Sequence, residues 1–276
     1  MGAIARNSDS GTMFVMSDLA HRLFVAVTLG LAGAALMPHR AAAADTDWRD
    51  IESRIQYAWY TEDGRDLAKV ADRVTALSAA EPLRNYYLAL TQLHQAQLAL
   101  AAAAASDGAA RLPAVAQAAG ACINSADDAL AARPTDGEVL ALQSLCMELR
   151  SRARPLDLPF AGSRSHAQMQ RALQLAPRNP RVRLLAAQLS YVAARSNQER
   201  AGLLDSFQSA VDAFELERQG LERTPAWGGA EAWEGLAQID LERGDAIAAR
   251  AALEHALLVV PEYTSAHRLL NHILTG

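Results

Sequence analysis

Apolar residues recur at helical spacing along almost the whole chain after residue 45, and this periodicity constrains the fold more than any other feature. Short alternating runs rich in Val, Ile and Thr, which are typical of strands, are missing from the same region. The sequence therefore predicts an all-α protein.

Short breaks divide this helical sequence into pairs. We expect a first pair over residues 46–60 and 65–77, with Asp63-Gly64 as its turn, and a second over 82–105 and 111–132. Insertions at 152–164 and in a longer helix at 198–220 make the later pairs irregular, and a polar-backed helix at 265–274 is expected to cap the stack. Proline stops a helix from continuing, and the prolines that close the second helices are Pro134, Pro177, Pro225 and Pro261.

Residues 230–261 carry the clearest repeat. Counted from Ala230, the large apolar, small, turn and closing residues are Trp233, Leu236, Ala237, Gly244, Ala249, Leu253, Ala256 and Pro261. This pattern resembles the tetratricopeptide (TPR) repeat. The resemblance implies a superhelix of antiparallel helical hairpins, because one hairpin cannot bury its apolar face alone. The N-terminal half is degenerate, and other solenoids, such as Sel1-like ones, remain open for it.

Residues 1–44 have the features of a cleaved signal peptide of a bacterial exported protein. Arg22 precedes an apolar run from Leu23 to Met37, and Ala42-Ala43-Ala44 gives a small-x-small cleavage pattern before Asp45. The run of about 15 residues is shorter than the roughly 20 that cross a bilayer. We therefore expect residues 45–276 to form a single repeat domain that is periplasmic or secreted and does not span a membrane after cleavage.

The two cysteines, Cys122 and Cys146, lie at equal distances before and after Pro134. If Pro134 marks the apex of an antiparallel hairpin, the equal counts place both at one height, because every helical residue rises 1.5 Å. A close pair in an oxidising compartment forms a disulfide. The alternative is two buried, reduced cysteines that act as small apolar fillers.

Charge and motifs give no support to nucleic-acid binding, catalysis or a cofactor. The formal net charge is -5, and no basic surface is visible. No nucleophile elbow, phosphate loop or dinucleotide fingerprint is present. His267 and His272 are five residues apart, whereas a metalloprotease helix needs a spacing of four. We therefore predict no catalytic residue, no metal and no cofactor.

Two groups of aromatic residues leave their role open. Trp227 lies in a loop flanked by proline and glycine, where it either caps the neighbouring hairpin or lines the edge of a groove. The residues Trp48, Tyr57, Trp59 and Tyr60 form either a terminal packing patch or a docking surface.

The TPR resemblance also implies a partner-binding groove, because the first helix of each hairpin lines the concave side of such arrays. The positions that it assigns to the groove are Glu231, Glu234, Gln238, Leu241 and Glu242, together with Arg181, Leu184, Gln188 and Tyr191. The carboxylates suggest a partner with a basic segment. The alternative is that they are ordinary exposed helix charges.

Two functions from different classes follow. The first is a non-catalytic periplasmic scaffold or adaptor that binds a peptide or protein partner, in envelope assembly or in a receptor system. The second is a helical-repeat enzyme that acts on polysaccharide with an acidic cleft. A closed cavity that holds two carboxylates roughly 5 to 10 Å apart would favour the enzyme.

Overall fold

The computed structural model describes residues 46–105, 112–154, 161–220 and 225–275. They belong to one compact unit, Asp45–Gly276. The expected signal peptide lies outside the described residues. Within the described ranges, no helix is both long enough and apolar enough to cross a membrane.

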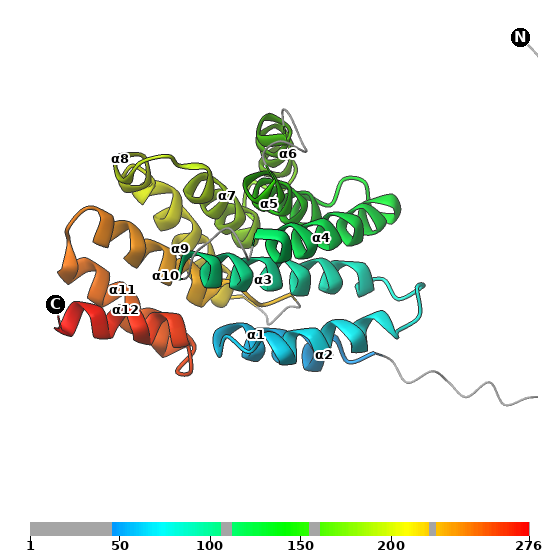
Figure 1. The fold of residues 1–276 in the computed structure, drawn as a ribbon, viewed down its shortest axis with the longest axis horizontal. Coiled ribbons are helices and arrows are strands. Elements are labelled where there is room, and N and C mark those ends of the chain that lie inside the picture. The colour runs from blue at the N-terminus through cyan, green and yellow to red at the C-terminus, as the bar shows by residue number, and fades with distance from the viewer. Residues whose placement is uncertain (1–45, 106–111, 155–160, 221–224, 276) are drawn as a thin grey trace, which may run out of the picture. The chain divides into compact units, whose positions relative to one another are not determined.

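The described part of the chain contains helices and no strands, which confirms the predicted all-α class (Figure 1). The helices are α1 (Trp48–Tyr60), α2 (Gly64–Thr75), α3 (Arg84–Ala104), α4 (Leu112–Ala132), α5 (Gly137–Ala153), α6 (Ala161–Leu175), α7 (Pro180–Ala193), α8 (Asn197–Ala201), α9 (Leu204–Arg218), α10 (Gly229–Glu242), α11 (Ala246–Val259) and α12 (Thr264–Thr275).

These helices pack as consecutive antiparallel hairpins, in a TPR-like stack. The pairs are α1 with α2, α3 with α4, α5 with α6, α7 with α9, and α10 with α11.

The predicted single helix over residues 198–220 is wrong, because Gly202 and Leu203 form a turn that separates α8 from α9. The predicted insertion at 152–164 lies partly outside the described residues.

Short polar side chains begin several of these helices. Asp47, Asp63, Asp136 and Asn179 each accept hydrogen bonds from backbone N–H groups of the following turn, which satisfies donors that have no partner inside the helix. Asp63 is thus the cap of α2, and Gly64 begins that helix. The left-handed residue of this turn is Glu62, with φ 55°.

A disulfide joins two neighbouring hairpins. Cys122 of α4 and Cys146 of α5 are bridged, with their Cα atoms 6.2 Å apart. Both are completely buried. The disulfide alternative for this pair is confirmed, and the equal spacing around Pro134 was the signal for it.

The first hairpin also contacts the last helices. The ring of Tyr60 at the end of α1 lies edge-on to Tyr263, with 4.8 Å between the centroids. Arg268 of α12 donates two hydrogen bonds to Glu62, at 3.0 and 2.7 Å. The start of the chain therefore packs against its end, and α12 does more than cap an open stack.

Candidate functional site

Four buried glutamates lie on the first helices of the hairpins, which we call the inner helices, and each accepts a hydrogen bond from a tyrosine of another element. Because burying a carboxyl group is costly unless it is hydrogen-bonded, each tyrosine stabilises a contact between two elements. The pairs are Tyr87 with Glu52, Tyr86 with Glu138, Tyr60 with Glu231 and Tyr263 with Glu234.

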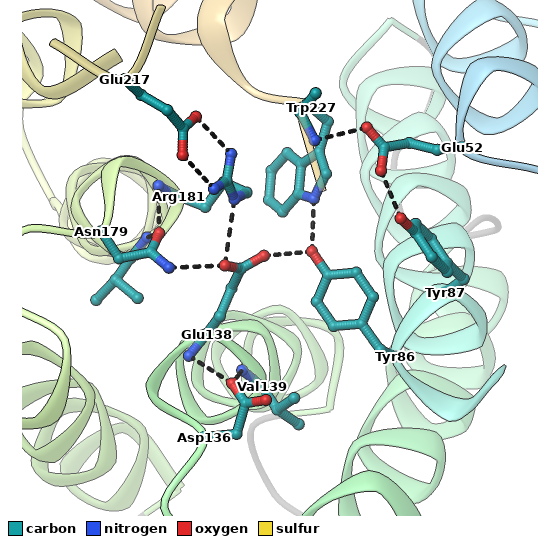
Figure 2. Close-up of polar contacts among 12 residues, drawn as sticks. Glu52, Tyr86, Tyr87, Asp136, Glu138, Val139, Asn179, Arg181, Glu217 and Trp227 are labelled. Atoms are coloured by element: carbon teal, nitrogen blue, oxygen red, sulfur yellow. Dashed lines mark hydrogen bonds and ion pairs between the residues drawn. The ribbon is translucent and has the colours of Figure 1, made fainter. Parts of the chain in front are cut away.

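Glu138 is the centre of the cluster in Figure 2. It accepts hydrogen bonds from Tyr86, from Asn179 Nδ2 at 2.7 Å and from Arg181 Nε at 3.2 Å. Arg181 extends the cluster, since its two terminal nitrogens donate to the two carboxylate oxygens of Glu217 at 2.9 and 2.6 Å. Burial alone would lower the pKa of Arg181, but the bond to Glu217 and the charge of Glu138 raise it.

The caps of α5 and α7 explain how Glu138 and Arg181 meet. Each follows its capping residue by two positions, so both side chains start in the first turn of an inner helix. Because α5 and α7 are adjacent first helices, equivalent positions face each other. This pair was not predicted from the sequence. The signal for it is the equal spacing in Pro134-Thr-Asp136-Gly-Glu138 and Pro177-Arg-Asn179-Pro-Arg181.

The loop before α10 enters the same cluster. Trp227 is buried, and its indole N–H donates to the hydroxyl of Tyr86 at 2.7 Å. The backbone N–H of Ala226 donates to Glu52 Oε1 at 2.7 Å. Burial raises the pKa of Glu52, although the bonds from Tyr87 and Ala226 act in the opposite direction. Trp227 is therefore packed against α3 inside the unit, rather than placed at the edge of a groove.

The N-terminal aromatic residues are packed in the same way. Trp48 stacks on Tyr87 with centroids 5.3 Å apart, and Trp59 stacks on His94 at 4.4 Å. Burial lowers the pKa of His94 to about 4. Tyr57 alone of the four predicted aromatic residues is exposed. The packing alternative therefore describes three of the four.

The predicted groove differs from the structure at four positions, because Arg181, Leu184, Glu231 and Glu234 are buried. Glu231 is covered by Tyr60 of α1, and Glu234 by Tyr263 and Ser265. These side chains are therefore unavailable to a partner in this conformation. The sequence pattern placed them on the inner face, but it carried no sign that the first and last helices cover that face.

The other five predicted positions are half-buried. They are Gln188, Tyr191, Gln238, Leu241 and Glu242. At this end of the inner face, Arg200 of α8 donates to Glu242 at 2.8 Å and lies over the ring of Tyr191, 5.7 Å from its centroid. Through Arg200, the short helix α8 therefore contacts two residues of the expected groove, Tyr191 and Glu242.

A pocket of about 530 Å³ lies at the other edge of the cluster, between α1, the end of α9, the start of α10 and the end of α11. Its charged residues are Arg49, Glu52, Glu215, Glu217 and Arg218. Its larger apolar residues are Phe214, Trp233, Val259 and Val260. Trp233 is half-buried, and its ring stacks on His255 at 4.5 Å, which fixes its orientation.

Each carboxylate of this pocket already has a partner in the protein. Glu52 binds Tyr87 and Ala226, Glu217 binds Arg181, and Glu215 pairs with Arg218. Over the described residues, no group of three or more His, Cys, Asp and Glu side chains could hold a metal ion. The pocket thus combines an apolar wall with carboxylates that already have partners in the protein.

Comparisons with known proteins add little to this description. No family model matches the sequence, and no curated protein matches it. Among solved structures, the chain is similar to a tetratricopeptide repeat protein from Parabacteroides merdae, with 15% identity and a TM-score of 0.29 over 82% of this chain and 100% of that one. A TM-score this low carries no argument, so the description of the fold rests on the helices themselves.

Proposed function

We propose that the protein is a non-catalytic binding scaffold of the periplasm, which holds a peptide or protein partner in the pocket between α1 and the α9–α11 end. The pocket itself is the observation that supports this function. Its volume of about 530 Å³ falls in the range of roughly 300 to 1,000 Å³ that is usual for ligand sites. The inner groove is a poorer candidate, because its central positions are buried.

The lining of the pocket suggests the chemistry of the partner. Phe214, Trp233 and Val259 offer an apolar wall for one large side chain of a partner segment. Three carboxylates against two arginines leave the lining with a small excess of negative charge. A partner segment with an apolar anchor next to a basic residue fits this surface, and the charges would act mainly on specificity and association rate.

The features of an export signal and the disulfide support a location outside the cytoplasm. Disulfides persist in oxidising compartments and are rare in the cytosol, and Cys122 and Cys146 are bridged. A role in envelope assembly or in a receptor system is the form of scaffold that agrees with this location.

The scaffold function is tested by affinity capture from a bacterial envelope fraction. The variant Val259→Arg places a charge at the pocket wall, where Val259 is 48% exposed, and Leu175→Arg is its matched control on α6, at 44% exposed. We expect wild type and the control to retain the same partner and Val259→Arg to lose it. Binding of the purified partner by calorimetry should weaken at least about tenfold. Equal retention by all three proteins would contradict the proposed pocket.

One observation favours the second candidate, an enzyme that acts on polysaccharide. Glu52 and Glu217 line the same pocket, and burial raises the pKa of Glu52, as a general acid requires. Release of reducing ends from envelope polysaccharide by wild type, but not by Glu52→Gln, would support the enzyme. No release by a preparation that retains its partner would leave the scaffold as the function.

A further inference from the structure

Exposed apolar side chains gather on the last two long helices. Ile247 and Leu258 of α11 are 85% and 79% exposed, and Leu274 of α12 is 59% exposed. A single exposed leucine needs no explanation, whereas several on neighbouring helices indicate an interaction surface. None of these three residues lines the pocket that we propose for the partner.

The exposed residues of α11 lie on one face of the helix. Ile247, Ala251, Glu254 and Leu258 follow the spacing of four, three and four residues that keeps side chains on one face. Arg250 flanks this face and donates to Glu254 at 2.8 Å. The opposite face, with Ala249, Ala252, Leu253 and Ala256, is buried. A shallow groove of about 490 Å³ between α11 and α12 borders the exposed face, next to Ile247 and Leu274.

Two copies of this face are complementary to each other when one copy is rotated by 180° relative to the other. In an antiparallel pair of α11 helices from two copies, Ile247 of each lies opposite Leu258 of the other. The same register places Ala251 opposite Glu254, and Arg250 within one residue of Glu254 of the second copy. Apolar side chains therefore meet at both ends, opposite charges meet between them, and the small Ala251 permits a close approach.

We propose that this face is a homodimer interface in which two copies pair antiparallel along α11, with Leu258 of each copy in the groove between α11 and α12 of the other. The charge pattern selects a second copy as the occupant, because every attraction occurs twice across a two-fold axis. Ile247 and Leu258 are separated along the helix by about 16 Å, so the two apolar contacts lie on either side of the axis.

The mass of the purified protein in solution tests the proposal, measured by sedimentation and light scattering over about 1 to 100 µM. We expect wild type to have the mass of two chains in the upper part of this range. Leu258→Arg should weaken dimerisation by about 100-fold, since each substitution acts twice. Arg250→Glu should weaken it at least about tenfold, because it creates two pairs of like charges.

Exchanging the two charges tests whether Arg250 and Glu254 pair across the interface. The double variant R250E/E254R restores both opposite-charge pairs, so its dissociation constant should return to within about threefold of wild type. Leu216→Arg on α9, at 70% exposed, is the control and should leave the dimer intact. Circular dichroism checks that each variant stays helical. A single-chain mass for wild type at all concentrations would overturn the proposal, as would a dimer that Leu258→Arg leaves unchanged or a swap that fails to restore it.

Discussion

Glu231 is a buried acid whose hydrogen bonding is incomplete. One of its carboxyl oxygens accepts the hydroxyl of Tyr60 at 2.7 Å, while the other has no hydrogen-bond partner within the part of the chain that the structure describes. Burial raises the pKa of Glu231 to about 7, and the nearby Glu234 acts in the same direction, whereas the bond from Tyr60 opposes both.

This shift predicts how stability depends on pH. Because the folded state holds the proton of Glu231 more tightly than the unfolded state, the contribution of this group is complete below its ordinary pKa of 4.5 and is lost as the pH rises through about 7. Glu231→Gln stays neutral at all pH values. The stability of Glu231→Gln relative to wild type should therefore rise by about 2.5 kcal/mol between pH 5 and pH 8.

Urea unfolding at both pH values measures this difference. His94, whose pKa is lowered by burial, is present in both proteins, so the comparison isolates Glu231. The exposed Glu262→Gln on the turn before α12 is the control and should follow wild type. If Glu231→Gln and wild type change in parallel with pH, the carboxyl group of Glu231 does not titrate in this range.

At the scale of the helices, close packing explains why some positions must be small. An added Cβ at Gly235 of α10 would lie 2.1 Å from the ring of Phe207 on α9, and that ring is buried. At Gly64, the first residue of α2, an added Cβ would meet nothing within 4 Å. Gly235 therefore sets the distance between α9 and α10, while Gly64 has no such role.

We predict that Gly235→Ala is destabilising even though alanine is the better helix former. The gain in helix propensity is about 1 kcal/mol, whereas overpacking a buried contact costs about 1–3 kcal/mol, and the overlap with Phe207 is severe. Gly64→Ala should be neutral or slightly stabilising. Thermal unfolding of both variants checks this, and equal melting temperatures would show that α9 moves away without cost.

The disulfide is the covalent link between hairpins. It joins Cys122 and Cys146, which are 24 residues apart in the sequence, and so restricts the unfolded chain. We expect the double variant C122A/C146A to lose about 2–4 kcal/mol of stability. Urea unfolding of this variant, of oxidised wild type and of reduced wild type measures the loss. Oxidised wild type no more stable than the reduced protein would contradict a stabilising bridge.

At the scale of the whole described unit, the contact between the first hairpin and the last helices is the main departure from an open stack. Its polar contacts differ in exposure. Tyr60 and Glu231 are buried, whereas Arg268 and Glu62 remain 58% and 31% exposed. Exposed ion pairs contribute little, so the hydroxyl of Tyr60 should matter more than the pair.

We therefore predict that Tyr60→Phe costs about 1–3 kcal/mol, because it leaves a buried carboxyl group without its donor. Glu62→Gln should cost less than about 1 kcal/mol. Hydrogen exchange gives a second readout, since the amides of α1 and α10 should lose protection together in Tyr60→Phe. Protection lost in α1 alone would show that the two ends of the unit open independently.

The sequence predicts the contacts between neighbouring elements well. The helical periodicity, the turns closed by Pro134, Pro177 and Pro261, and the spacing of the two cysteines around Pro134 each involve neighbouring elements, and the structure agrees with them. Pro225 differs, because α9 already ends at Arg218. The contacts of Tyr60 with Glu231 and of Glu62 with Arg268 span 171 and 206 residues. Contacts between residues so far apart produce no periodic pattern in the sequence. Glu231 and Glu234 were therefore predicted to lie on an accessible face.

The buried contact of Tyr60 with Tyr263 and Glu231 also limits how this chain can change in evolution. An open solenoid gains or loses hairpins freely, because each unit contacts only its neighbours. Here an added hairpin would separate α1 from α12, and a deleted one would force them into the same space. We therefore expect the number of hairpins to be constrained, so that change should come by substitutions and loop insertions more readily than by whole repeats.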